Sequence, residues 1–595
     1  MFLPWRRRWL RRGSKAGARP LRRSPVRLRL EPFEDRILLA THTWTGAGNG
    51  NWSSAANWDN GTQAPVAGDD LVFPSSAVAF ASNNDFASDT PFHSLTFTGS
   101  GYTLTGAQVQ LDVGGVTDNA TGDNNINLDF DLPALRTFGV AAGGQMFLGG
   151  TISGGPFGGL IKAGAGKLVV TGANSYAGGT TVSQGTLNIR QGSALGVGGA
   201  IVNGGAAFEL QGGIAVGFQT LTLNGNGIQG AGVLRNVSGI NSWGGPIILA
   251  SDSGMVTEAG RLRLDAAISG PGGLSLLRGG AGSELWLTAA NTYSGATTVS
   301  SGGTLTLREG GTVLNSPSIT VRGATLNLDN FGDGGSADFN RNNRIANGTS
   351  ISLSGGTFNF LGNDIDDSIQ NMGAINLASG FSRITSRDGG GSRAATLTSS
   401  RLNRSPGATV SFEGTDLATF TNRILFTTPP VPVGGILPGV TFTDAVNGTE
   451  LATYSSFGID GMLYYPLFTV NSFVAGANVV ITAPFVSVPD PGVVINSLMF
   501  FGGGITVTGA PLTISSGALL APGIGENINV PRLDFGSTEG IVTTQGSATL
   551  TINSAIAGSR GLTKSGTGQL ILGNLTPDAG NVYTGLTTLS IWSSS

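Results

Sequence analysis

One stretch of the chain decides its fold: residues 159–187 read GLIKAGAGKLVVTGANSYAGGTTVSQGTL. Short runs of apolar and β-branched residues, such as Leu168–Val170 and Thr180–Val182, alternate with turns of Gly, Ala and Asn. Such runs are the length of strands, and the glycine and asparagine clusters between them are typical of turns. The stretch therefore predicts a strand, turn, strand rhythm and no helix.

The same order of residues returns twice more. The second copy runs from Gly273 to Leu305, with Leu276 where the first copy has Lys162. The third copy begins at Gly561, restores the lysine as Lys564 and continues to Leu589. Each copy keeps an Asn-x-Tyr-x-Gly segment followed by a Thr-Thr pair. Three ordered copies predict a repeat architecture in which each unit stacks on the next.

This pattern resembles the autotransporter-associated β-strand repeat of bacterial surface passenger regions. The resemblance covers residues 158–195, 272–307 and 561–590, and it implies a right-handed parallel β-helix. Short Thr-Leu strands with period-two alternation extend the prediction to the rest of the chain, at Leu221 and Leu223, Leu326 and Leu328, Phe358 and Phe360, and Leu550 and Ile552. We predict an all-β chain, a right-handed parallel β-helix (solenoid) with irregular insertions.

The composition agrees with a stacked coil. The chain has 97 Gly among 595 residues, and only 12% of its residues are charged. In a parallel coil each side chain meets an equivalent one about 4.8 Å above and below, so stacked like charges repel. Glycine meanwhile tolerates the positive φ of tight corners.

We predict five regions along the chain: 1–40, a basic export or surface-targeting segment; 41–145, an N-terminal cap and first β coils; 146–400, β-helix repeats; 401–500, a less regular β region with a Pro-rich insertion; and 501–595, C-terminal β-helix repeats. For 401–500, insertion loops on the coil and a separate small module both fit. The third repeat stops before the Gly-Thr-Leu strand that the other copies have, so we expect a truncated C-terminus.

The first 40 residues carry twelve Arg or Lys against three acids, while the remainder has a net charge of -12. Residues 30–40, LEPFEDRILLA, resemble a segment near the start of many large planctomycete surface proteins. That resemblance implies export, whereas the alternative is a basic arm on a cytoplasmic protein. An acidic body disfavours nucleic acid as a partner. No apolar run approaches the roughly 20 residues needed to span a bilayer.

The sequence offers little material for catalysis or metal binding. It has no cysteine and two histidines, His42 and His93, which rules out a thiolate site and disfavours a histidine-rich one. Asp364, Asp366 and Asp367 form the tightest acidic cluster and could bind Ca²⁺ or act as acid and base, but an Asx-rich surface turn explains them better. We assign no catalytic, cofactor-binding or metal-binding residue and no cofactor.

Two further motifs have plainer explanations. Asp329–Gly334 is similar to a calcium loop, but Phe331 occupies a position where an oxygen ligand belongs, so a glycine-rich turn is expected. Trp44, Trp52 and Trp58 could stack on sugars, yet capping the open end of a coil needs the same residues, and we predict core packing.

These observations predict a secreted or surface-exposed structural passenger, without enzymatic activity, that adheres to extracellular polysaccharide, matrix or other cells. A carbohydrate-active β-helix enzyme and a cell-envelope spacer are the alternatives.

Overall fold

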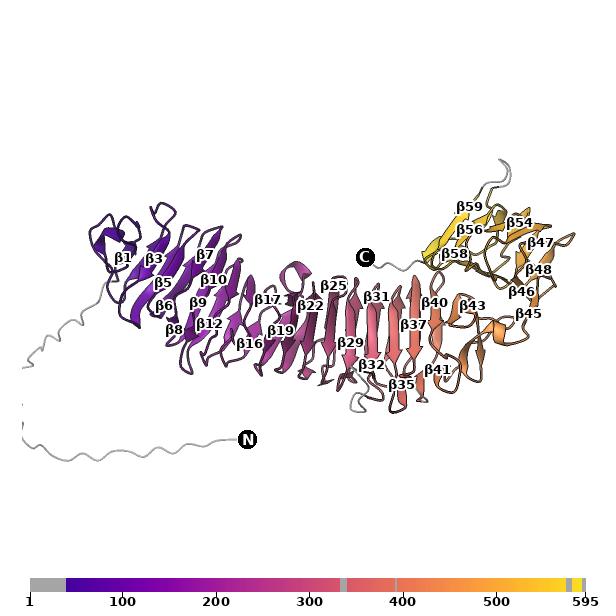
Figure 1. The fold of residues 1–595 in the computed structure, drawn as a ribbon, viewed down its shortest axis with the longest axis horizontal. Coiled ribbons are helices and arrows are strands. Elements are labelled where there is room, and N and C mark those ends of the chain that lie inside the picture. The colour runs from indigo at the N-terminus through magenta and orange to yellow at the C-terminus, as the bar shows by residue number, and fades with distance from the viewer. Residues whose placement is uncertain (1–38, 332–339, 391–392, 574–579, 591–595) are drawn as a thin grey trace, which may run out of the picture. The chain divides into compact units, whose positions relative to one another are not determined.

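The computed structural model describes residues 39–331, 340–390, 393–573 and 580–590. Within these residues the chain is all-β, with three short 3₁₀ turns, η1 (Ala55–Asn57), η2 (Ile228–Gly230) and η4 (Met462–Tyr464), and no α-helix. The strands wind into a parallel β-solenoid of about 23 turns (Figure 1). The predicted all-β solenoid is therefore confirmed. None of the described residues forms a helix that is long and apolar enough to cross a membrane.

Successive coils stack in register. Leu160 of β12 (Gly159–Ala163) pairs with Thr180 of β14 (Thr180–Val182), which pairs with Ala200 of β16 (Ala200–Val202). All named strand pairings in the described part of the chain are parallel except those of one hairpin, β42–β43–β44. The next strands in this row are β19 (Leu221–Gly225) and β22 (Ile247–Thr257), and β9 (Leu135–Val140) precedes them.

A second face of the coil is a sheet of twelve strands. Its strands are β18 (Ala215–Val216), β21 (Ile240–Trp243), β23 (Arg261–Leu264), β26 (Glu284–Leu287), β29 (Thr304–Arg308), β32 (Thr325–Asp329), β34 (Thr357–Leu361), β37 (Phe381–Arg387), β40 (Thr409–Glu413), β42 (Val440–Asp444), β43 (Gly448–Ser455) and β44 (Gly458–Gly461).

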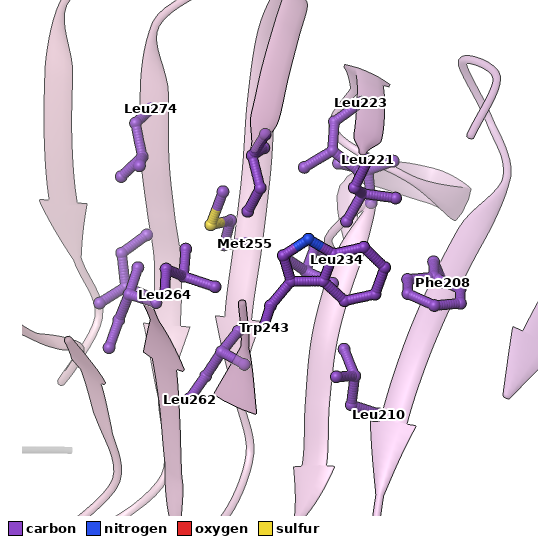
Figure 2. Close-up of a cluster of buried hydrophobic side chains, with 14 of the residues drawn as sticks. Phe208, Leu210, Leu221, Leu223, Leu234, Trp243, Met255, Leu262, Leu264 and Leu274 are labelled. Carbon is purple, nitrogen blue, oxygen red and sulfur yellow. The ribbon is translucent and has the colours of Figure 1, made fainter. Parts of the chain in front are cut away.

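Apolar side chains at every second position of the strands fill the interior of the coil. Figure 2 shows side chains such as Phe208, Trp243 and Leu262 pointing toward one another from different strands. The four predicted Thr-Leu strands lie in β19, β32, β34 and β56 (Thr549–Ile552), and their apolar pairs are all buried. Full burial of each such side chain stabilises the coil by roughly 1.5–3 kcal/mol.

The N-terminal end of the coil is closed by aromatic residues. Trp44, Trp52 and Trp58 have no exposed surface, and Trp44 meets Trp58 edge to face with ring centroids 5.0 Å apart. Phe73 of β2 (Asp70–Phe73) lies beneath all three rings and stacks on Phe97. The predicted packing of these tryptophans in the core is confirmed, so their faces are not available to sugars.

A second solenoid follows the hairpin. The strands β45 (Phe468–Val470), β46 (Asn478–Ile481), β49 (Ser497–Phe500), β52 (Ala518–Leu520), β55 (Gly540–Thr543), β58 (Leu562–Ser565) and β60 (Thr587–Ser590) form one of its sheets. Every residue of β46, β49, β55 and β58 is buried. By contrast, β47 (Phe485–Val488), in another sheet, buries only Val488. These four strands of the first sheet are therefore covered on both faces.

Residues of the first solenoid cover the outer face of that sheet. Thr409 of β40 hydrogen-bonds through its hydroxyl to Ser565 at 2.7 Å, and Arg404 pairs with Glu539 at 2.7 Å. An apolar cluster joins the two solenoids, with Ile436, Leu451 and Met462 from the first and Val480, Met499, Ala518 and Leu520 from the second. The two solenoids thus share a packed contact.

Candidate functional site

The most distinctive residues of the repeat link neighbouring coils. The Asn174 carboxamide accepts a hydrogen bond from the Ile152 amide at 2.7 Å and donates one to the Ala194 carbonyl at 2.6 Å. Those partners lie 22 residues before and 20 residues after it. The equivalent Asn291 and Asn581 accept in the same way from Ile268 and Ile556. This asparagine therefore ties coils together in all three copies.

The tyrosine and the lysine of the repeat are structural as well. The Tyr176 hydroxyl hydrogen-bonds to Thr180 at 2.6 Å, and the same pair recurs at Tyr293–Thr297 and Tyr583–Thr587. Lys162 donates to the carbonyls of Ala163, Gly164 and Gln184, which closes the glycine corner, and burial lowers its pKa to about 8. The recurring side chains of the repeat motif make hydrogen bonds that hold the coil together. A binding function must therefore use other surface residues.

The outer face of the twelve-stranded sheet carries such residues. Paired positions on β21 through β37 place Ser242, Arg263, Trp286, Thr306, Asn327, Asn359 and Thr385 in one row. We call this row, with the flanking Arg261, Glu284, Arg308 and Asp329, the polar strip.

The centre of the polar strip is an indole held between two guanidinium groups. The Arg261 guanidinium carbon lies 3.5 Å and that of Arg308 3.9 Å from the centre of the Trp286 ring. The indole nitrogen donates to Glu284 at 2.6 Å. Beside them lies a cavity of about 320 Å³, also lined by Thr306, Asn327, Asp329 and Leu361. Stacking on Trp286 fixes both arginines in place.

Charges on the polar strip occur in pairs of opposite sign. Arg263 binds Glu309 at 2.9 Å, Arg261 lies 3.5 Å from Glu284, and Arg308 lies 3.8 Å from Asp329. Amides continue the row, since Asn359 donates to Asn327 at 2.8 Å and Asn327 to Thr306 at 3.1 Å. The strip therefore offers many fixed donors and acceptors with little net charge. Chemically, it suits an uncharged, hydroxyl-rich polymer better than an ion.

The acidic cluster found in the sequence lies in the turn after β34. Asn363 accepts hydrogen bonds from the amides of Ile365 and Asp366 at 2.9 and 3.0 Å, as an Asx turn requires. Asp367 accepts from the Ala394 amide at 2.8 Å. Within the described ranges, neither these carboxylates nor any other His, Asp or Glu side chains form a group of three that could hold a metal ion.

The other candidates from the sequence also have local roles. The His42 imidazole lies between Asp59 at 2.6 Å and Asp69 at 3.2 Å, and His93 contacts Asp70 at 2.7 Å. In the loop that resembles a calcium site, Asp329 accepts from the Phe331 amide at 3.0 Å, while residues 332–334 lie outside the described residues. The basic stretch 1–38 lies outside them too.

A second pocket, of about 360 Å³, was not predicted from the sequence. Asp416, Asp444, Asp460, Phe457, Tyr464 and Tyr465 line it with five smaller or aliphatic residues. Tyr465 donates to Asp460 at 2.6 Å, and Tyr464 donates to Asp444. Burial raises the pKa of the nearby Glu450 to about 7. The residues that line this pocket come from separate loops around the β42–β44 hairpin, and no local sequence motif marks them.

Comparison with known proteins agrees with the repeat pattern. A family model described as the passenger-associated-transport-repeat matches residues 160–189, 284–307 and 562–590. Adhesin BmaC autotransporter of Brucella suis biovar 1 (strain 1330) is 31% identical over 266 residues, 44% of this chain and 6% of that relative. The chain thus corresponds to a small part of the relative's length. No solved structure gives a significant match. The chain therefore contains repeats similar to the passenger-associated-transport-repeat, and the matched repeats lie in both solenoids.

Proposed function

We propose that this chain is a surface-exposed or secreted adhesive passenger without enzymatic activity, and that the polar strip binds extracellular polysaccharide. The observation that carries the proposal is the fixed Arg261–Trp286–Arg308 stack beside a cavity of about 320 Å³. The chain's similarity to part of a named adhesin supports the adhesive role.

Many weak contacts suit this surface. Parallel pairing repeats donors and acceptors about every 4.8 Å along the strip, so an extended polymer can meet several coils at once. Each contact is modest, and their number gives the avidity. Because ion pairs neutralise the strip, binding is expected to depend only weakly on salt.

A glycan array probed with the full chain tests the proposal, followed by titration of each retained polysaccharide. Arg308→Ala and Asn327→Ala should each weaken binding at least threefold. Thr222→Ala, on a different face of the coil, is the matched control and should not change binding. The proposal is wrong if no glycan binds, or if all three variants bind equally well.

The carboxylate pocket at the hairpin favours a second candidate, a carbohydrate-active enzyme. Asp444 and Asp460 line one cavity with two tyrosines, and glycoside hydrolysis generally uses two carboxyl groups. Release of reducing ends from a bound polysaccharide, lost in Asp460→Asn, would support this activity. Binding without any release would support the passive adhesin.

A further inference from the structure

The row of positions that forms the polar strip continues past β37. Thr385 pairs with Glu413 of β40, and Glu413 pairs with Thr443 of β42. Thr443 pairs in turn with Thr449 of the antiparallel strand β43. Phe442, the chain neighbour of Thr443, lies in the core, so the Thr443 side chain faces outward, as the strip does. One line of outward positions therefore runs from the polar strip to the hairpin.

This line ends against the second solenoid. Strand β44 pairs with residues 452–455 of β43, so the row stops at Thr449. The Thr449 hydroxyl donates a hydrogen bond to the Gln545 carboxamide of the second solenoid at 3.3 Å. The same carboxamide donates to Thr441 of β42 at 3.4 Å, and Thr441 is buried. Gln545 is thus fixed across the end of the row.

A cavity of about 720 Å³ lies where the row meets the second solenoid. The outer face of the twelve-stranded sheet lines one side of it, and the turns that follow β49, β52, β55 and β58 line the other. We call this cavity the end cleft, with Arg383, Glu413, Thr443 and Thr449 from the sheet and Phe501 and Gln545 from the second solenoid. Its volume is in the range of small-ligand sites.

The end cleft combines polar groups that are held in place with one aromatic surface. Its charges cancel, because Arg383 lies 3.4 Å from Glu413. The Thr443 hydroxyl hydrogen-bonds to that of Thr449 at 3.0 Å. Phe501, by contrast, is 41% exposed. A sugar ring has apolar C–H faces and a polar edge, so it can pack on the phenyl ring while its hydroxyls bond to the sheet.

The end cleft and the cavity beside Trp286 lie along the same row. Five strand pairings lead from Trp286 to Glu413. At about 4.8 Å for each pairing, the two sites are roughly 24 Å apart along the coil. A polymer that lies on the polar strip can therefore occupy both. Binding at one site then raises the effective concentration of the polymer at the other.

We propose that the end cleft binds the terminal sugars of a neutral polysaccharide whose preceding part lies on the polar strip. This inference rests on the proposed function and adds that the protein recognises an end of the polymer. The reason is steric: a polymer that follows the row meets Gln545, and its interior has to bend away from the surface there. A chain end can fill the cleft because no further sugars have to leave it.

End recognition is tested by changing the number of chain ends at constant mass. The probe is the neutral polysaccharide that the glycan array retains, used intact and after partial acid hydrolysis to fragments still longer than the row between the two sites. Hydrolysis that raises the number of ends about tenfold leaves the mass of interior sugars nearly unchanged. At equal mass concentration, end recognition predicts apparent binding about tenfold tighter for the fragments. Recognition of interior sugars alone predicts no gain.

Variants at Phe501 place this effect in the end cleft. Phe501→Ala removes the aromatic surface, so it should weaken binding of the fragments at least threefold and abolish their gain over the intact polymer. Phe501→Tyr keeps the ring and should bind as the wild type does. The matched control is Phe485→Ala, because Phe485 of β47 is 78% exposed and does not line the end cleft. It should bind the fragments normally and keep their gain.

The result also separates this inference from the proposed function. If Arg308→Ala weakens binding while Phe501→Ala does not, or if the fragments gain nothing, the polar strip binds polysaccharide and end recognition is wrong. An equal loss in Phe485→Ala would likewise overturn the role of the cleft. If Arg308→Ala binds as the wild type does, or if the array retains no neutral polysaccharide, the proposed function is wrong and end recognition falls with it.

Discussion

The Asn174 link between coils gives the sharpest test of how the repeat stabilises the solenoid. Asn174→Ala removes an acceptor from the Ile152 amide and a donor from the Ala194 carbonyl. Asn174 is only 6% exposed, so water cannot easily replace either bond. Each backbone group left without a partner costs about 1–3 kcal/mol. The two together should lower the free energy of local opening by about 2–6 kcal/mol.

A coil of repeats opens locally, so a global melting temperature is the wrong measurement. Amide hydrogen exchange read by mass spectrometry reports each coil separately. Peptides containing Ile152 and Ala194 should exchange at least thirtyfold faster in Asn174→Ala, since about 1.4 kcal/mol corresponds to tenfold. The N-terminal coil around Phe73 should not change.

Asn315→Ala is the matched control, because Asn315 is exposed and makes one bond to the Thr292 carbonyl at 3.2 Å. It should alter exchange less than threefold. If Asn174→Ala leaves the Ile152 amide as protected as in the wild type, or if both variants act alike, the repeat asparagine does not tie the coils.

Three further outcomes follow from buried polar groups. Burial raises the pKa of Glu526 to about 8, so the folded state favours its neutral form and local stability should fall as pH rises from about 4.5 to 8. Between pH 5 and pH 9, after correction for the intrinsic exchange rate, the peptide containing residue 526 should lose less protection from hydrogen exchange in Glu526→Gln than in the wild type, and an unchanged pH profile would contradict this. Lys162→Met removes three bonds to corner carbonyls and should speed exchange at Gly164, whereas rates equal to the wild type would show that the lysine is dispensable there. Glu539→Gln weakens the pairing with Arg404 and should speed amide hydrogen exchange in β58 by about tenfold. Exchange in β12 should not change, and equal effects in both strands would refute a local contact.

The sequence predicted the coil because the information for it is local. Period-two alternation decides which side chains of a strand turn inward, and glycine corners decide where the strand ends, so the pattern alone places Leu221 and Leu223 in the core, where they lie. The burial of Trp44, Trp52 and Trp58 followed from the need to close an open coil end. The repeat motif itself was visible, although its role in bonding coils was not.

One signal of the second solenoid was present in the sequence and missed. Residues 478–481 and 497–500 read NVVI and SLMF without alternation, and such unbroken runs indicate strands covered on both faces. The Pro-rich stretch that precedes them favours insertions instead. The contacts of Arg404 with Glu539 and of Thr409 with Ser565 span 135 and 156 residues, and no local pattern encodes them.

By itself, the sequence determined that this chain coils, where many of its strands run and which of their side chains are buried. Only the tertiary structure decided which side chains lie next to one another on the surface of the coil. The lengths of the turns vary: Leu160, Thr180, Ala200, Leu221 and Ile247 stack although 20, 20, 21 and 26 residues separate them. Position along the chain therefore does not give position around the coil. The Arg261–Trp286–Arg308 stack exists because pairing between coils, through backbone hydrogen bonds and core packing, fixes a register that spacing in the sequence leaves open.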